Sequence, residues 1–229
     1  MKKVVLVIVE GTTDKVSLEA VLEKIFNDNK VSIEIIGGDI TSDEKTTLKN
    51  AVKRLSDRIN SHIYKMRIKR ADILKIIQII DIDGVYIRDD LIVENPTVRL
   101  LYKHEGIETW NRDKIIERNE RKRNIIDKLL STNKILNTDY KLYYFSCNLE
   151  HVLHDDLSEL SIEEKMGKAE DFENMYGDNP QEFKELISDN TVKVEGNYME
   201  TWDFIKDNNN SIRRCTNFHL LFENHEEDE

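Results

Sequence analysis

Two strongly apolar, β-branched runs that each end in carboxylates constrain this chain more than any other feature. The first run, VVLVIVEG, ends in Glu10, and the second, IIQIIDIDG, ends in Asp81 and Asp83. Continuous apolar runs of this length are typical of strands that are buried on both faces of a parallel sheet. We therefore predict an α/β protein in which acidic residues follow the carboxyl ends of two strands.

The spacing of apolar residues around these runs predicts alternating strands and helices. The expected elements up to residue 84 are a strand at 4–9, a helix after Gly11, a strand at 31–36, a helix from Leu48 towards Arg70 and a strand at 73–82. Right-handed crossovers in such a β-α-β-α-β order make the strands parallel. Residues 85–110 have no clean period and are expected to form a surface insertion, and a helix at 115–130 and a strand at 140–145 follow.

The rest of the chain is expected to be mainly helical. Asn148 can cap a short helix, Ser161 and Glu164 fit a capping box, and Pro180 fits a helix start. The 229 residues suit one α/β domain with an appendage. We predict a catalytic domain at 1–155 and a helical C-terminal extension at 156–229 that ends in an acidic tail.

Composition limits the compartment and the redox chemistry. No apolar run approaches the roughly 20 residues that a membrane-spanning helix needs. The N-terminal run mimics a signal peptide but ends in Glu10 without a small-residue cleavage site, so a cytoplasmic protein is expected. Cys147 and Cys215 are too few for a disulfide framework and are expected to be buried or free thiols.

Charge restricts how this protein can contact nucleic acid. A formal net charge of −11 argues against nonspecific coating of a phosphate backbone. The segment HIYKMRIKR is nevertheless basic, and its Lys65, Arg67, Lys69 and Arg70 are candidate nucleic-acid contacts. A solvated helix face is the alternative interpretation of the same residues.

The strand-end carboxylates indicate a metal site. Ligands bind at the carboxyl ends of strands in open α/β sheets, so Glu10, Asp81 and Asp83 are expected to converge. Three close carboxylates repel one another unless a cation neutralises them, and ligation by oxygen alone favours Mg²⁺ or Mn²⁺. This donor set predicts metal-dependent phosphoryl chemistry.

With Glu10-Gly11 after the first strand and Asp81-Ile82-Asp83 after the third, residues 1–155 resemble the Toprim family. This is the catalytic domain that topoisomerases, primases and OLD-type nucleases share. The resemblance implies a Rossmann-like fold with a central, mainly parallel sheet flanked by helices. It also implies that Glu10 transfers a proton or bridges metals, and that Asp81 and Asp83 hold Mg²⁺. Asp14 and, more loosely, Glu150 resemble further acidic residues of the family's metal site.

The chain departs from the larger Toprim proteins, since it has no recognisable zinc module, ATPase or topoisomerase tyrosine domain. The resemblance therefore favours a small OLD-like nuclease that cleaves DNA or RNA, in phage defence or in nucleic-acid processing. A protein activator or partner subunit is part of this hypothesis, and a membrane partner is not.

Two other functions stay open at the level of the sequence. DIDGVY resembles the nucleophile motif of haloacid-dehalogenase-like phosphatases, with Asp81 attacking phosphate, although that motif normally follows the first strand. A noncatalytic module that binds a metal or a protein partner is the other alternative. Asp14 and Glu150 also fit simple first-turn helix charges, and His151 and His154 fit either packing or proton transfer.

Overall fold

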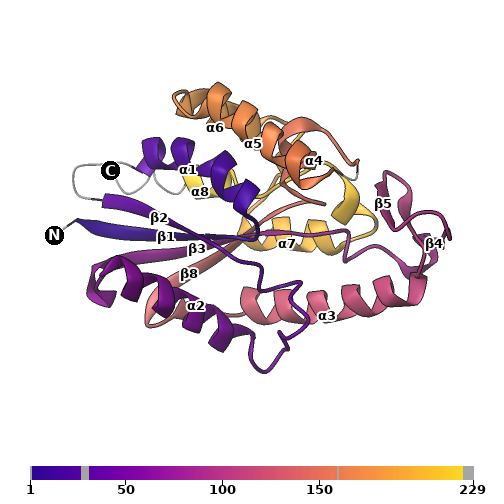
Figure 1. Ribbon diagram of the computed structural model, residues 1–229, viewed down its shortest axis with the longest axis horizontal. Coiled ribbons are helices and arrows are strands. Elements are labelled where there is room, and N and C mark those ends of the chain that lie inside the picture. Colours follow the sequence, from indigo (N-terminus) through magenta and orange to yellow (C-terminus); the bar gives the residue numbers. More distant parts are fainter. Residues whose placement is uncertain (1, 27–30, 159, 224–229) are drawn as a thin grey trace. The chain divides into compact units, whose positions relative to one another are not determined.

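The computed structural model describes residues 2–26, 31–158 and 160–223 as an α/β protein with a mixed, mostly parallel central sheet (Figure 1). The strands are β1 (Lys3–Val9), β2 (Val31–Gly37), β3 (Ile73–Asp81), β4 (Ile92–Glu94), β5 (Leu100–Lys103), β6 (Gly106–Thr109), β7 (Lys134–Ile135) and β8 (Thr138–Phe145). The helices are α1 (Thr12–Phe26), α2 (Ala51–Met66), α3 (Arg112–Leu130), α4 (Leu149–His154), α5 (Ile162–Tyr176), α6 (Pro180–Ser188), α7 (Tyr198–Lys206) and α8 (Leu220–Glu223). Residues 224–229 of the predicted acidic tail lie outside the described residues.

The chain forms two compact units that interleave along the sequence. The first unit comprises Met1–Ile80, Asn124–Leu142 and Met166–Pro180, and the second comprises Asp81–Arg123, Tyr143–Lys165 and Gln181–Glu229. Neither unit coincides with the predicted segments 1–155 and 156–229, because each draws on several stretches of chain. The segment after 155 is mainly helical, as predicted. The assignment of catalysis to residues 1–155 stays a prediction.

Most of the five-stranded sheet, which has the order β2-β1-β3-β8-β7, belongs to the first unit. β1 pairs in parallel with both β2 and β3, with Ile8 beside Ile36 on one side and beside Gln78 on the other. The predicted β-α-β-α-β order and its parallel strands are therefore confirmed. Figure 1 shows α1 and α2 on opposite sides of these strands. Because helices cover both faces of the sheet at β1, the side chains on both faces of this strand are buried and apolar, and apolar and polar residues do not alternate along it.

Helix α2 differs from its predicted bounds at both ends. It begins at Ala51, so Leu48 precedes the helix and is 53% exposed instead of starting the apolar stripe. The helix ends at Met66 because Arg67 takes a left-handed conformation, with a φ of 57°, and its N–H bonds to Ile63 and Tyr64. The stripe itself is confirmed, since Leu55 and Ile59 are fully buried.

Local capping signals in the sequence are confirmed. The N–H of His151 donates to Asn148 Oδ1 at 2.9 Å at the start of α4. Ser161 and Glu164 exchange two hydrogen bonds at the start of α5, and Pro180 is the first residue of α6. These caps can be predicted from the sequence because the donor and the acceptor lie within one helical turn of each other.

The predicted surface insertion at 85–110 is wrong, because this segment builds a core in the second unit. It contains a three-stranded sheet in the order β4-β6-β5. Its apolar residues form a buried cluster with residues from later segments: Ile87, Ile92, Ile107, Ile115, Cys147 and Ile212. Strands of three or four residues are too short to show a clear period.

Among the described residues, no helix has both the length and the apolar character that a membrane crossing requires.

Candidate functional site

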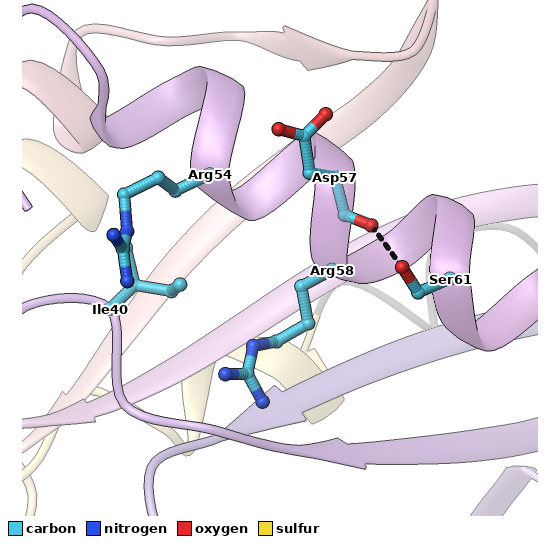
Figure 2. Close-up of a pocket in the computed structure, with 5 residues that line it drawn as sticks. All are labelled: Ile40, Arg54, Asp57, Arg58 and Ser61. Atoms are coloured by element: carbon cyan, nitrogen blue, oxygen red, sulfur yellow. Dashed lines mark hydrogen bonds between the residues drawn. The ribbon is translucent and has the colours of Figure 1, made fainter.

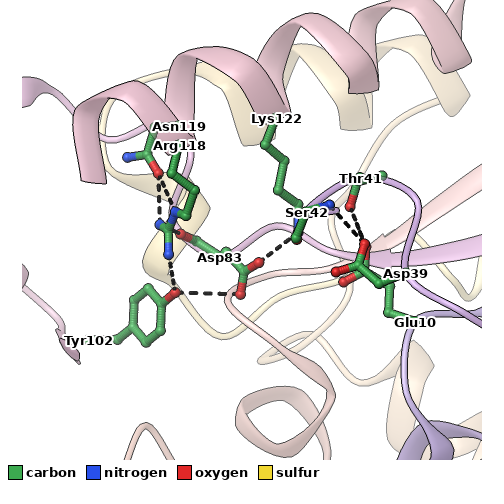
Figure 3. A network of polar contacts seen from close by, with 9 residues as sticks. All are labelled: Glu10, Asp39, Thr41, Ser42, Asp83, Tyr102, Arg118, Asn119 and Lys122. Carbon is green, nitrogen blue, oxygen red and sulfur yellow. Dashed lines mark hydrogen bonds and ion pairs between the residues drawn. The ribbon is translucent and has the colours of Figure 1, made fainter. Parts of the chain in front are cut away.

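Glu10 follows the last residue of β1 and is held by the loop after β2, within the first unit. The buried Thr41 hydroxyl donates to Glu10 Oε1 at 2.5 Å. The N–H of Ser42 donates to Asp39 Oδ1 at 2.8 Å, which shapes the turn that carries Thr41 (Figure 3). The loop is joined to β1 by a further bond from Gly38 N to Val9 O at 2.8 Å. Glu10 therefore has a carboxylate oxygen with a defined orientation.

Asp14 lies in the first turn of α1, where its carboxylate closes the helix start. The Gly11 N–H donates to Asp14 Oδ2 at 2.7 Å, and the Thr13 hydroxyl lies 3.4 Å from Oδ1. An acidic side chain at this position satisfies an orphan N–H and complements the helix dipole. These contacts explain Asp14 without a metal ion.

Asp83 lies at the centre of a polar network in the second unit (Figure 3). Its Oδ2 forms an ion pair of 2.6 Å with Lys122 Nζ, and Lys122 is fully buried. Arg118 donates to the carbonyl oxygen of Asp83 at 2.8 Å, to Tyr102 Oη at 3.0 Å and to Asn119 Oδ1 at 2.7 Å. The Tyr102 hydroxyl lies 3.5 Å from Asp83 Oδ1.

The electrostatics of this network keep Asp83 ionised. Burial alone would raise the pKa of Asp83, but the charges of Lys122 and Arg118 outweigh burial and hold it below its usual value. Burial and the Asp83 charge raise the pKa of Tyr102, so Tyr102 remains a protonated donor. Asp83 fits a metal ligand poorly, because a divalent cation at its carboxylate would face the buried ammonium of Lys122.

Asp81 is the last residue of β3 and is half-buried. Its charge acts on the buried Cys147, whose pKa is raised first by burial and then by Asp83 and Asp81. Cys147 is therefore a protonated thiol, which agrees with the sequence prediction and suits neither a nucleophile nor a metal ligand.

Glu150, in the first turn of α4, has an unsatisfied oxygen. Its Oε1 pairs with Lys165 Nζ at 3.1 Å, and the Glu150 side chain is 6% exposed. Its Oε2 is buried and has no hydrogen-bond partner among residues 2–26, 31–158 and 160–223. A buried acceptor without a donor is costly and indicates a missing partner such as a cation. Glu150 thus fits a metal ligand better than Asp83 or Asp14 does.

His151, beside Glu150, is fully buried, and neither ring nitrogen has a hydrogen-bond partner within the part of the chain that the structure describes. Burial lowers its pKa to about 4 despite Asp155, whose Oδ1 lies 3.9 Å from Nε2. The ring is therefore neutral near pH 7.

The predicted carboxylates fall into two groups, since Glu10 and Asp14 belong to the first unit while Asp81, Asp83 and Glu150 belong to the second. No group of three or more His, Cys, Asp or Glu residues within 2–26, 31–158 and 160–223 is arranged to hold a metal ion. The candidate nucleic-acid residues Lys65, Arg67, Lys69 and Arg70 are exposed, and Arg70 bonds to Asn60 Oδ1 at 2.7 Å.

Sequence reasoning missed two pairs of cations. Arg118 and Lys122 lie four residues apart on α3 and surround Asp83. Arg54 and Arg58 have the same spacing on α2 and line a cleft. The spacing of four, which places both side chains on one helix face, was the available signal. The spacing alone did not indicate which face of α2 or of α3 is buried.

No family model, curated protein or solved structure matches the chain. The class that the fold defines is an α/β protein with a mostly parallel sheet and acidic residues after two neighbouring parallel strands.

Proposed function

We propose that this protein is a metal-dependent nuclease that hydrolyses phosphodiester bonds in DNA or RNA. One observation carries the proposal: Glu10 and Asp81 come at the ends of β1 and β3, which are parallel neighbours in the sheet. Strand ends of this kind are the usual location of ligand sites in open α/β sheets. The Toprim-like order of Glu-Gly and Asp-x-Asp supports the same function.

Within the second unit, Asp81 and Glu150 would hold Mg²⁺ or Mn²⁺. Glu10, which follows β1 in the first unit, would accept or donate the proton. The unsatisfied Oε2 of Glu150 supports its role as a ligand. The Thr41 hydroxyl orients Glu10. Lys122 and Arg118 hold Asp83 as a positioning residue next to the metal ligand Asp81. A bound divalent ion would supply charge neutralisation and an activated water.

The ion pair of Asp83 disfavours the phosphatase alternative. In that mechanism Asp83 would exchange a proton with the leaving group, but Lys122 and Arg118 lower its pKa and favour the ionised form, even though burial alone would raise it. A role in phage defence or nucleic-acid processing, with an activator or partner subunit, is a further part of the nuclease proposal.

The test compares wild-type protein with Glu10→Gln, Asp81→Asn and the control Asp171→Asn, which alters an exposed carboxylate of α5. Each is incubated with supercoiled plasmid, single-stranded DNA and RNA in EDTA, Mg²⁺ or Mn²⁺. We expect metal-dependent cleavage that falls at least about 100-fold in the two site variants and is retained in the control. Full activity in both folded site variants would rule out the proposed site.

A further inference from the structure

A cleft in the first unit lies between α2 and the loop that follows β2. Its volume is about 440 Å³, and it is lined by Ile40, Arg54, Asp57, Arg58 and Ser61. Figure 2 shows the side chains of Arg54 and Arg58 extending from the same side of α2, one turn apart, whereas the carboxylate of Asp57 points away from them. The cleft is therefore lined by cations although the whole chain is acidic.

Among the residues that the structure describes, no carboxylate around the cleft pairs with Arg58. Arg54 Nη2 pairs with Asp43, and Asp57 pairs with Lys53 at 2.9 Å. Arg58 donates only to the carbonyl oxygen of Gly37, at 2.6 Å, and has no carboxylate partner within the described part of the chain. A guanidinium with unused donors and no counterion is suited to a phosphate, whose oxygens accept paired hydrogen bonds.

Arg54 adds a second unused donor. Its Nε is buried and has no hydrogen-bond partner in the described parts of the chain, although its terminal nitrogen pairs with Asp43. Buried N–H groups without an acceptor are rare, since each costs free energy. An anion in the cleft would supply the acceptor that this donor lacks.

Gly38 fixes the position of the Arg58 guanidinium. Its φ is +146°, and a Cβ built there would lie 1.7 Å from Arg58 Nη1. Only glycine allows the backbone to approach this closely in this conformation. The guanidinium is thus held in place before any ligand arrives, which lowers the entropy cost of binding.

The same loop connects the cleft to the proposed active site. Gly37 accepts the hydrogen bond of Arg58, and Thr41, four residues later, donates to Glu10. A phosphate bound by Arg58 would lie on the loop that orients Glu10. This placement suits a backbone phosphate that flanks the bond to be cleaved.

We propose that this cleft is a phosphate subsite in which Arg58, assisted by Arg54, binds a backbone phosphate of the nucleic-acid substrate. The inference rests on the proposed nuclease function for the identity of the substrate, and on the cleft itself for the binding of phosphate. It places substrate contacts on the middle of α2, in addition to the exposed cations near the end of that helix.

The first experiment uses inorganic pyrophosphate as the probe, so that it does not depend on nuclease activity. Thermal unfolding of wild type, Arg58→Gln, Arg58→Lys and the control Lys128→Gln is followed with increasing pyrophosphate, against sodium chloride of equal ionic strength. Lys128 is an exposed cation of α3 in the same unit. We expect pyrophosphate to raise the unfolding temperature of wild type and of the control. It should raise that of Arg58→Lys by less and leave that of Arg58→Gln unchanged.

The second experiment measures binding of a labelled single-stranded oligonucleotide in EDTA, where the proposed cleavage is blocked. We expect Arg58→Gln to weaken binding about tenfold and to reduce the slope of log affinity against log salt by about one, while Lys128→Gln changes neither. Equal affinities and slopes for Arg58→Gln and wild type would overturn the subsite.

The two proposals fail in different ways. Loss of pyrophosphate stabilisation in Arg58→Gln, in a protein that binds and cleaves no nucleic acid, would keep the phosphate site and reject the nuclease. Cleavage by wild type combined with unchanged behaviour of Arg58→Gln in both experiments would keep the nuclease and reject the subsite.

Discussion

At the scale of single residues, the charge of Asp83 is balanced inside the protein and not by solvent. Lys122 is fully buried and Asp83 is 22% exposed at the side chain, so removal of either partner leaves a poorly solvated charge. Asp83 also has a φ of 53°, a conformation that asparagine tolerates. Asp83→Asn is therefore a clean probe of the charge.

We predict that Asp83→Asn and Lys122→Met each lower the free energy of unfolding by about 3 kcal/mol, because each removes one member of a buried ion pair. The double variant should lose at least about 1 kcal/mol less than the sum, since neither charge then remains. Urea unfolding of the four proteins measures this coupling, with Lys128→Met as the exposed control. Additive losses would show that the pair is not coupled.

The same residue distinguishes a positioning role from metal ligation. If Lys122 occupies the place of a cation, Asp83→Asn should keep Mn²⁺ affinity within about threefold in calorimetry, whereas Asp81→Asn and Glu150→Gln should lose at least about tenfold. Loss of Mn²⁺ binding in Asp83→Asn with unchanged stability would instead assign Asp83 to the metal site.

At the scale of secondary-structure elements, the start of α1 explains Asp14. The carboxylate accepts the N–H of Gly11 at 2.7 Å, and the side chain is buried. A cap of this kind belongs to the helix and needs no ligand.

We predict that Asp14→Ala lowers the free energy of unfolding by about 1 kcal/mol, because an orphan N–H loses its acceptor and the helix dipole loses its charge. Metal-dependent cleavage, corrected for the folded fraction, should remain. Chemical denaturation and the plasmid assay measure the two effects. A stable variant that no longer cleaves would move Asp14 into the active site.

At the scale of the whole molecule, buried histidines make stability depend on pH. Burial lowers the pKa of His219 and lowers that of His151 to about 4. Both groups have a pKa near 6.5 in the unfolded chain, so the unfolded state binds more protons below that pH. Their contribution to stability is complete above about pH 6.5 and is lost as the pH falls.

We predict that the free energy of unfolding decreases between pH 6.5 and pH 4.5, and that His219→Leu makes this decrease shallower. Part of the dependence of the unfolding free energy on pH should remain in the variant, because His151 is still present. Urea unfolding at several pH values measures it, and the slopes of the two proteins above pH 7 should coincide as an internal control. Identical slopes below pH 6.5 would show that His219 is not buried in its neutral form.

Much of the architecture follows from local pattern. The apolar runs of β1 and β3, the stripe of α2 and the caps at Asn148 and Ser161 depend on neighbours within a few residues, so the sequence predicts them. The short strands β4, β5 and β6 escaped prediction, because their stability comes from packing against residues as distant as Ile212.

The sequence by itself determined the order of β1, β2 and β3 along the chain, their parallel direction and the acidic residues at the ends of β1 and β3. Only the tertiary structure decided which carboxylates are already neutralised. Lys122 lies 39 residues from Asp83, and Thr41 lies 31 residues from Glu10. Partners this far apart leave no periodic signal, because side-chain charge is balanced by neighbours in space and not by neighbours in sequence.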